Sequence, residues 1–313
     1  MKQKILLTGG AGFLGQNFVK KSMYDKYPYD IASIDRITNS SAYNSLYTNK
    51  NHQFYIGDIL DEHFLDIIFD IERPAIVVHM AAMTSIEQSD KFLMNNIIGT
   101  QNVLNVSKKY DVKKFIYISC DSVYGNTEQE GLCLLKEADS SFPTNLYAIS
   151  KLSGEMLVKT SGLKYNILRA SNIYGRRQAI NKFIPQIIKS VLNNVNIPIY
   201  GDGRFIRDWL HVDDFSSVLM RIIDGDKNNE IYNVSANQEF SNLEVAQLVC
   251  NIMEKGHGLI KHIDDPIGVG HDFRYGINCD KIKKDFNWEA KHKLKSGLLD
   301  VVKWNVDNRF LLR

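Results

Sequence analysis

Two residues four positions apart, Tyr147 and Lys151, carry side chains suited to proton transfer. They lie on a predicted helix opened by Pro143-Thr144-Asn145, and their spacing places both on one helix face. A free tyrosine has a pKa near 10, so appreciable phenolate at neutral pH requires lowering it by roughly three pH units, about 4 kcal/mol. Because a lysine ammonium favours that ionisation, the pair predicts a general acid/base. A solvated helix face carrying the same spacing by chance is the alternative.

A glycine-rich turn precedes this pair far upstream, in the segment Thr8-Gly-Gly-Ala-Gly-Phe-Leu-Gly15. It follows an apolar run and opens a helical pattern, which is the context that gives such a turn mechanical meaning. Gly9 and Gly12 permit a tight turn and close approach of the backbone to a pyrophosphate, and Gly15 lets the helix pack on the strand. The segment therefore predicts a dinucleotide site.

An acidic residue twenty positions after Gly15 indicates which dinucleotide binds. Asp35 ends the next apolar run, where a carboxylate can accept hydrogen bonds from an adenosine ribose and would repel a 2′-phosphate. This favours NAD over NADP as the cofactor, with the neighbouring Arg36 as the feature that argues the other way.

Apolar runs alternate with segments of helical period in the first half of the chain. Strands are predicted at 4–8, 31–34, 53–56, 75–79, 114–119 and 165–169, and helices near 13–25, 61–71, 91–110 and 145–160. This alternation predicts an α/β protein with a doubly wound parallel sheet.

Beyond about residue 170 the pattern loosens, with a late helix near 242–254. We predict a dinucleotide-binding domain over 1–170, with a return segment at about 204–235. The segments 171–203 and 236–313 are expected to form a smaller, discontinuous α/β substrate lobe, with a ligand cleft between the two.

The composition excludes several classes of protein. A formal net charge of +2 on 313 residues gives no field that argues for nucleic acid or an anionic membrane as a partner. No Cys-x-x-Cys pair occurs among Cys120, Cys133, Cys250 and Cys279, and no histidine cluster has metal-ligand spacing. We expect no metal, a reducing compartment, no signal peptide or membrane span, and a location in the cytoplasm.

Motifs along nearly the whole chain extend this interpretation. They are Gly57-Asp58-Ile59, His79-Met-Ala-Ala82, Asn96-Ile-Ile-Gly-Thr100, Val123-Tyr-Gly125, Arg169-Ala-Ser-Asn172-Ile-Tyr-Gly175, Gly201-Asp-Gly203, Arg207-Asp-Trp-Leu-His-Val-Asp-Asp214 and Gly270-His-Asp-Phe-Arg-Tyr275. With the glycine turn and the Tyr147/Lys151 pair, they make the chain resemble the extended short-chain dehydrogenase/reductases, which have a Rossmann fold. Within them it resembles the nucleotide-sugar 4,6-dehydratases.

The resemblance implies further site residues. Implied cofactor contacts are Phe13, Leu14, Asp58, Ile59, Ala81, Ala82, Thr84, Asn96 and Ser119. Implied substrate contacts are Asn172, Arg207, Asn242 and His271 at the diphosphate, and Lys182, Phe183, Pro198 and Tyr200 around the nucleobase and ribose. The guanidinium of Arg207 matches phosphate oxygens, with a salt bridge to Asp208 or Asp213 as the alternative. For His271 the alternative is a structural histidine.

The resemblance also implies the reaction. Tyr147 takes the proton of the sugar 4-hydroxyl while NAD accepts the hydride of carbon 4; water leaves across carbons 5 and 6, and the hydride returns to carbon 6. This describes a hydro-lyase acting on UDP- or dTDP-glucose, early in the synthesis of a deoxysugar such as rhamnose. A nucleotide-sugar 4-epimerase and a non-catalytic NAD-binding sensor are the alternatives. A homodimer formed through helices 91–110 and 145–160 is implied as well.

One segment departs from the dehydratase pattern. Those enzymes usually place Asp and Glu side by side after a Thr, whereas here the segment is Ser119-Cys120-Asp121-Ser122. Asp121 matches the acid that protonates the departing hydroxyl. Ser122 stands in the place of the glutamate base, and Cys120 replaces the threonine.

The missing base leaves several candidates. If the Cys120 thiol is deprotonated near the Lys151 and nicotinamide charges, it is expected to help with proton transfer, and an inert small residue is the alternative. Glu87 and His79 are further candidates for the base at carbon 5.

Overall fold

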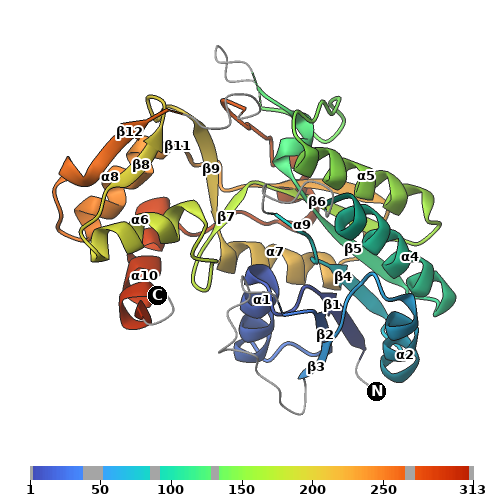
Figure 1. The fold of residues 1–313 in the computed structure, drawn as a ribbon. Coiled ribbons are helices and arrows are strands. Elements are labelled where there is room, and N and C mark those ends of the chain that lie inside the picture. The colour runs from blue at the N-terminus through green and yellow to red at the C-terminus, as the bar shows by residue number, and fades with distance from the viewer. Residues whose placement is uncertain (1–2, 38–51, 85–91, 128–133, 265–271, 310–313) are drawn as a thin grey trace.

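The central feature of the fold is a parallel sheet. The computed structural model describes the chain except for residues 1–2, 38–51, 85–91, 128–133, 265–271 and 310–313. In the described part, seven parallel strands pair in the order β10-β6-β5-β4-β1-β2-β3 (Figure 1). Their bounds are Lys4–Thr8 (β1), Asp30–Asp35 (β2), His52–Ile56 (β3), Ile76–His79 (β4), Lys114–Cys120 (β5), Tyr165–Ala170 (β6) and Glu230–Val234 (β10). The predicted doubly wound α/β fold is confirmed.

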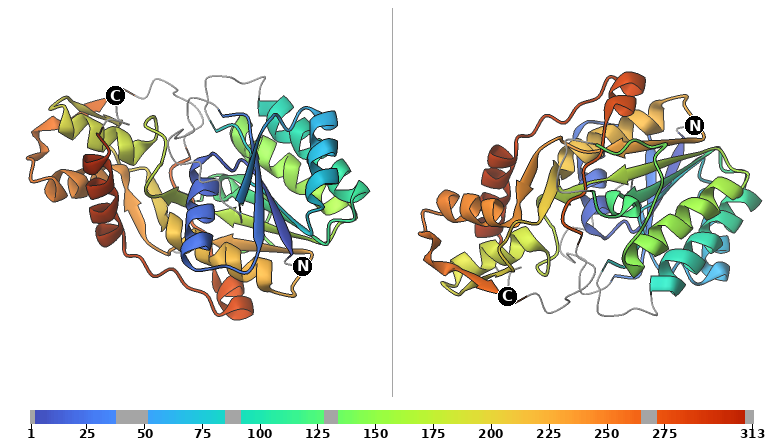
Figure 2. Two further views of the ribbon diagram at one scale, coloured as in Figure 1. Left: turned by 90° about the horizontal axis from the view of Figure 1, so that it is seen from below. Right: turned by 90° about the horizontal axis from the view of Figure 1, so that it is seen from above.

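Helices cover both faces of this sheet because alternate residues of each strand point to opposite sides. Ile5 and Leu7 of β1 belong to one apolar cluster, and Leu6 between them belongs to another. The first cluster includes residues of α1 (Phe13–Tyr24) and α7 (Val212–Asp224); the second includes residues of α2 (Glu62–Glu72), α4 (Gly99–Lys109) and α5 (Leu146–Thr160). Figure 2 shows the two helical layers on either side of the sheet.

The strand order fixes where a ligand can enter. β1 lies between β2 and β4, so the chain winds away from it in both directions. The crevice outside the carboxyl ends of two such strands is the usual ligand position in open α/β sheets. The predicted glycine turn follows β1 at this edge.

The predicted helix 91–110 is interrupted by a wider turn. A π-helix, η2 (Leu93–Ile98), precedes α4, and its Asn95 and Asn96 are both buried. The Asn96 side chain accepts a hydrogen bond from the backbone N–H of Met83 and donates to the Met83 carbonyl and the Ser150 hydroxyl. Such π-turns often mark functional sites, and this one anchors the segment that follows β4.

The second half of the chain builds a separate apolar core. Its strands form a three-stranded sheet of β11 (Glu239–Ser241), β9 (Ile206–His211) and β7 (Asn172–Tyr174), and a pair of β12 (Ile260–Ile263) and β8 (Ile197–Tyr200). Its helices are α6 (Phe183–Leu192), α8 (Asn242–Ile252) and α10 (Leu294–Asp307), whereas α9 (Asp280–Phe286) packs against β10 of the central sheet. Ile188, Val249 and Leu298 pack together in this core. We propose that the chain divides into two lobes at the predicted boundaries.

No helix in the described part of the chain is both long enough and apolar enough to pass through a membrane.

Candidate active site

The glycine turn brings backbone amides to the crevice at the end of β1. Gly9 has φ +78°, and a Cβ on it would lie 2.8 Å from the backbone nitrogen of Ala81. A Cβ on Gly15 would lie 2.5 Å from the carbonyl oxygen of Gly9. The helix can therefore approach the turn this closely only with a glycine at position 15. Gly12 caps α1 without a side-chain hydrogen bond, which leaves the first-turn amides open. These features fit a pyrophosphate.

Asp35 and Arg36 lie where the adenosine end of a dinucleotide is expected. Asp35 accepts hydrogen bonds from the backbone N–H groups of Ala11 and Ile37, each at 3.0 Å. Arg36 Nη1 lies 3.0 Å from Asp58 Oδ2. Because Asp58 already pairs with the charge that would attract a 2′-phosphate, the arrangement supports NAD.

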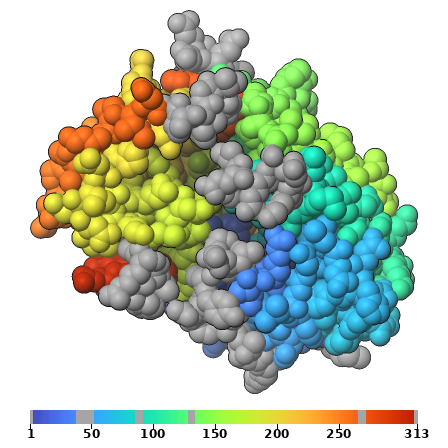
Figure 3. Space-filling model, viewed as in Figure 1, coloured from blue at the N-terminus to red at the C-terminus, as the bar shows by residue number. Residues whose placement is uncertain are grey.

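A cleft of about 1390 Å³ begins at this turn. Figure 3 shows the first and second halves of the chain on opposite sides of the molecule, and the cleft takes residues from both. It brings together most of the predicted site residues: Gly9, Gly12, Phe13, Leu14, Asp35, Asp58, Ile59, Ala81, Ala82, Thr84, Ser119, Cys120, Asp121, Ser122, Tyr147, Lys151, Asn172, Lys182 and Arg207.

Other predicted residues do not line the cleft. Gly15 and Asn96 lie behind it, in the turn and in η2. Phe183 stacks on Trp209 with ring centroids 6.1 Å apart. Three more residues lie elsewhere, Pro198 and Tyr200 on β8 and Asn242 at the start of α8, and His271 falls outside the described residues. Substrate contacts by this group stay predictions.

The predicted acid/base pair lies in this cleft. Lys151 is buried, with Nζ 4.1 Å from the centre of the Tyr117 ring, and burial lowers its pKa to about 8. Removal from water raises the pKa of Tyr147, and its hydrogen bond to Cys120 contributes in the same direction. Burial therefore opposes the predicted lowering of the Tyr147 pKa, and the neighbouring Cys120, Tyr117 and Asp121 add to the rise.

Cys120 and Ser122 form a hydrogen-bonded pair beside Tyr147. The Cys120 sulfur lies 2.8 Å from the Ser122 oxygen, where β5 passes into the short 3₁₀ helix η3 (Asp121–Tyr124). Burial, followed by the charge of Asp121, raises the pKa of Cys120 to about 12. In this environment the neutral thiol is favoured, so a Cys120 thiolate stays a prediction that would depend on the added charge of the nicotinamide ring.

Asp121 is the acidic group of the same segment. Asp121 is 4% exposed, and its Oδ2 atom has no hydrogen-bond partner in the described structure. Burial raises the pKa of Asp121 to about 7, and the charge of Arg207 opposes that rise. Asp121 can therefore exchange a proton near neutral pH.

Arg207 contributes a positive charge to the same cleft. Its guanidinium lies 4.6 Å from the centre of the Tyr275 ring and donates to the carbonyls of Ile206 and Phe273. Among the described ion pairs, none joins Arg207 to Asp208 or Asp213, the alternative considered from the sequence. The Arg207 guanidinium lines the cleft, where it could also pair with an anion.

The two other candidate bases are not in the described lining of the cleft. His79 is buried, with Nδ1 2.6 Å from the Thr8 hydroxyl and Nε2 2.9 Å from the Thr100 hydroxyl. Burial lowers the pKa of His79 to about 3. His79 thus links β1, β4 and α4, whereas Glu87 lies outside the described residues.

Several residues of the lining were not predicted as site residues. Thr144 and Tyr275 lay within motifs read from the sequence, but neither had a role. The Thr144 hydroxyl donates to Asp272 at 2.7 Å, which ties the start of α5 to the C-terminal segment. Phe92 and Gln178 also line the cleft, and no sequence motif distinguished them.

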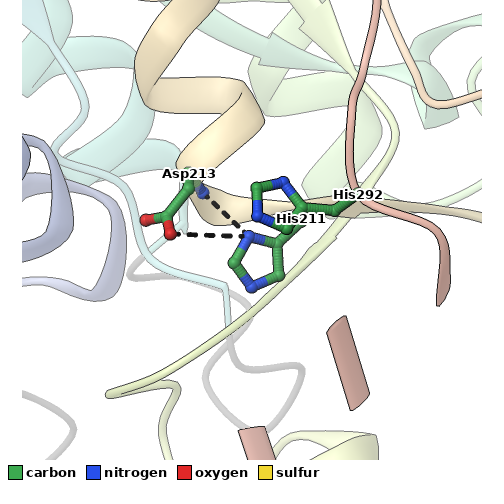
Figure 4. A group of neighbouring side chains, drawn as sticks. All are labelled: His211, Asp213 and His292. Atoms are coloured by element: carbon green, nitrogen blue, oxygen red, sulfur yellow. Dashed lines mark hydrogen bonds and ion pairs between the residues drawn. The ribbon is translucent and has the colours of Figure 1, made fainter. Parts of the chain in front are cut away.

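A histidine cluster outside the cleft has the residue types of a metal site (Figure 4). The rings of His211 and His292 stack with centroids 4.1 Å apart and planes 25° apart. Nitrogen lone pairs lie in the ring planes, so those of two nearly parallel rings do not converge on one ion. His211 Nδ1 already accepts from the backbone N–H of Asp213, and His292 Nδ1 lies 3.0 Å from Asp214. We interpret the cluster as a structural joint.

The fold and the cleft together define an NAD-binding enzyme of the extended short-chain dehydrogenase/reductase class. Residues 5–235 match the NAD dependent epimerase/dehydratase family, and the chain belongs to that family.

Individual relatives resemble the chain over nearly its full length. The dTDP-glucose 4,6-dehydratase of Streptomyces niveus is 30% identical over 321 residues, which cover 98% of this chain and 94% of the relative. The crystal structure of the dTDP-glucose 4,6-dehydratase of Bacillus anthracis in complex with NAD has a TM-score of 0.91 and 32% identity, covering 99% of this chain and 98% of that one. The UDP-glucose 4-epimerase of Thermotoga maritima, with UDP-glucose, has a TM-score of 0.89 and 28% identity, covering 98% and 100%.

These similarities bear on three predictions. The predicted family, the NAD cofactor and the hydro-lyase type of enzyme are confirmed.

Proposed function

We propose that this protein converts dTDP-glucose to the 4-keto-6-deoxy sugar nucleotide by an internal hydride transfer. The observation that carries the proposal is the gathering of Tyr147, Lys151 and Asp121 in one cleft that runs from the glycine turn to Arg207. A base for the first oxidation, a second proton carrier and a cation for the diphosphate then lie within reach of one bound substrate.

Each residue has a role that follows from its surroundings. Tyr147 removes the proton of the sugar 4-hydroxyl, and Lys151 supplies a positive charge beside it. NAD, held by the glycine turn and Asp35, supplies the hydride acceptor and a positive nicotinamide ring that favours the tyrosinate. Arg207 and Asn172 hold the diphosphate, with Lys182 nearer the nucleoside.

The choice of nucleotide rests on the relatives. The Streptomyces niveus enzyme is a dTDP-glucose 4,6-dehydratase, which supports thymine over uracil for this chain. The two bases differ by one methyl group, and such a group is worth only about 1–3 kcal/mol in a pocket. UDP-glucose is therefore the second substrate to measure, and a deoxysugar such as rhamnose is the proposed destination of the product.

A 4-epimerase is the second candidate, and Ser122 is the observation that favours it. An epimerase needs Tyr147 but no acid/base pair for loss of water, and the Thermotoga maritima epimerase has a similar fold. Asp121, buried and free to exchange a proton, argues for the dehydratase because an epimerase has no use for it.

Product analysis tests the proposal. The holoenzyme is incubated separately with dTDP-glucose and UDP-glucose, and the products are identified by NMR. The proposal predicts a new methyl doublet from carbon 6, with dTDP-glucose turned over faster. A galactose nucleotide would contradict it in favour of the epimerase, and unchanged substrate would indicate a non-catalytic NAD-binding protein.

We also propose a homodimer in the cytoplasm. Its support is a set of exposed apolar side chains on η2 and α5, namely Leu93, Met94, Ile98, Leu146, Ile149 and Met156. The free thiols of Cys120, Cys250 and Cys279 suit a reducing compartment.

A further inference from the structure

The loss of water from carbons 5 and 6 needs one group to accept a proton and one to donate a proton. Carboxylates are the usual carriers, and three of them line the described cleft: Asp35, Asp58 and Asp121. Asp35 is held by the backbone N–H groups of Ala11 and Ile37, at the opposite end from Tyr147. Asp58 pairs with Arg36 at that same end.

Asp121 is therefore the one carboxylate that the described lining places beside Tyr147. Cys120 precedes it and is hydrogen-bonded to Tyr147, so the reacting carbons must lie next to this segment. Within the described residues its Oδ2 atom has no hydrogen-bond partner, so no described side chain competes for the proton.

The two neighbours of Asp121 cannot supply the missing base. The hydroxyl of Ser122 and the thiol of Cys120 are hydrogen-bonded to each other at 2.8 Å. Burial raises the pKa of Cys120 to about 12, so both groups stay protonated and neutral. A neutral hydroxyl or thiol is too weak a base to remove a proton from carbon 5.

We propose that Asp121 alone serves both halves of the elimination, taking the proton of carbon 5 and then giving it to the hydroxyl that leaves carbon 6. This inference rests on the proposed function. The carboxylate breaks the C5–H bond and becomes a carboxylic acid. The electron pair left on carbon 5 forms the C5=C6 bond, the C6–O bond breaks, and the departing oxygen takes the proton from Asp121 and leaves as water.

The step balances without any further reactant. Asp121 ends as the carboxylate it was at the start, and neither oxidation nor reduction occurs. When carbon 5 is reprotonated later, the proton comes from water through the same carboxyl. Tyr147 returns to solvent the proton that it took from the 4-hydroxyl, so one proton enters and one proton leaves in each turnover.

A carboxyl that both takes and gives a proton works best when its two forms are equally populated. Burial raises the pKa of Asp121 to about 7, which meets this condition near neutral pH. Since the carboxylate must start the step, dehydration by the wild type should become faster as the pH rises through about 7.

The decisive experiment is hydrogen exchange at carbon 5 in the Asp121→Asn holoenzyme. The variant is incubated with dTDP-glucose in D₂O, and the sugar is recovered for NMR. It should still form reduced cofactor, seen by absorbance, because Tyr147 is intact. Dehydration should fall by at least about 10²-fold, and carbon 5 should carry no deuterium. Deuterium at carbon 5 in this variant would show a separate base and overturn the inference.

Two further variants sharpen the result. Asp121→Asn combined with Ser122→Glu should regain deuterium at carbon 5, because a carboxylate again stands beside the reacting carbon, while dehydration stays slow. If that double variant gained no exchange, the segment would not face carbon 5 and the inference would fail. Glu87→Gln should exchange and dehydrate as the wild type does, and loss of exchange there would move the base to Glu87.

Two controls separate this inference from its premises. Retained NAD binding and a cooperative thermal transition would show that Asp121→Asn folds. If it does not fold, Asp121→Glu takes its place. That variant keeps a carboxyl group, so it should still exchange hydrogen at carbon 5. A wild type that makes no 4-keto-6-deoxy product removes the proposed function and this inference together. A wild type that dehydrates, with a variant that exchanges, removes only the inference.

Discussion

At the scale of the residue, Asp121 combines a cost to stability with a use in chemistry. A carboxyl buried to 4% exposure without a partner for Oδ2 loses the hydration that its charged form needs. Arg207 compensates only in part, since the pKa of Asp121 remains raised to about 7. A side chain kept in such a place is more readily explained by proton transfer than by packing.

This cost predicts the effect of Asp121→Asn on stability. Because the folded protein binds this proton more tightly than the unfolded chain does, wild-type stability falls as the pH rises from about 4 to 7. The asparagine has no charge to bury. The free energy of unfolding of the variant, relative to that of the wild type, should increase by on the order of 2 kcal/mol between about pH 5 and pH 8. Urea unfolding of the cofactor-free proteins measures it. A gap that is constant over this range would mean that the carboxyl is well solvated.

The sequence identified residues whose side chains are typical of catalysis. It did not identify residues that reach the cleft only through the packing of the fold. Tyr147, Lys151 and Asp121 were identified from spacing and motif, and the structure brings them into one cleft. The burial that raises the pKa of Cys120 could not be predicted, because a motif carries no information on how deeply its residues are buried. Gln178 reaches the cleft only through the packing of the second half of the chain.

At the scale of the element, the turn between β1 and α1 sets the cofactor site. In the described central sheet β10 was not predicted as a strand, whereas the other six strands were predictable because each is an apolar run with a helical segment after it. The strands β7 and β11 were not, since each has three residues and carries too few apolar positions to show a period. The π-helix η2 was missed as well, because its residues fit an ordinary helix equally well.

Gly9→Ala tests the turn. Gly9 has φ +78°, and a Cβ there would lie 2.8 Å from the backbone nitrogen of Ala81, so the alanine strains the turn or displaces the segment that follows β4. We expect a loss of about 1–3 kcal/mol in stability and weaker NAD binding, measured by urea unfolding and by titration. Gly256→Ala is the matched control, because nothing lies within 4 Å of its Cβ. Equal NAD affinity in the two variants would contradict this role for the turn.

At the scale of the whole molecule, contacts between the two halves of the chain hold the cleft in shape. The Thr144 hydroxyl donates to Asp272, and Lys182 Nζ donates to the Thr84 hydroxyl at 3.0 Å. Asp214 of α7 accepts from the backbone N–H of His292, in the segment that leads into α10. The cleft therefore depends on the joint of His211 and His292 as well as on its own lining.

His292→Gln tests this joint through its pH dependence. The hydrogen bond to Asp214 raises the pKa of His292, with Asp213 and Asp300 adding to it, while burial lowers the pKa of His211 to about 4. The stabilisation from His292 is present below the unfolded pKa and is lost as the pH rises through the folded value. The variant should melt below the wild type at about pH 6 and approach it at about pH 9. A difference independent of pH would leave His292 with a packing role only.

Met156→Glu tests the proposed dimer. Met156 is 47% exposed on α5, and burying a charge at an apolar interface would weaken association. Light scattering coupled to size-exclusion chromatography should show a dimer for the wild type and a shift toward monomer for the variant. Tyr24→Glu is the control, since Tyr24 is 87% exposed on α1, away from this surface. A monomeric wild type, or a variant that stays dimeric, would contradict the proposal.

The measurement that tests the central claim most directly follows one hydrogen. The holoenzyme is supplied with dTDP-glucose that carries deuterium at carbon 4, and the product is examined by NMR and mass spectrometry. An internal hydride transfer predicts that the deuterium appears on carbon 6 of the same sugar, in a singly deuterated methyl group. Deuterium that remains on carbon 4 after full conversion, or that is lost to solvent, would contradict the account.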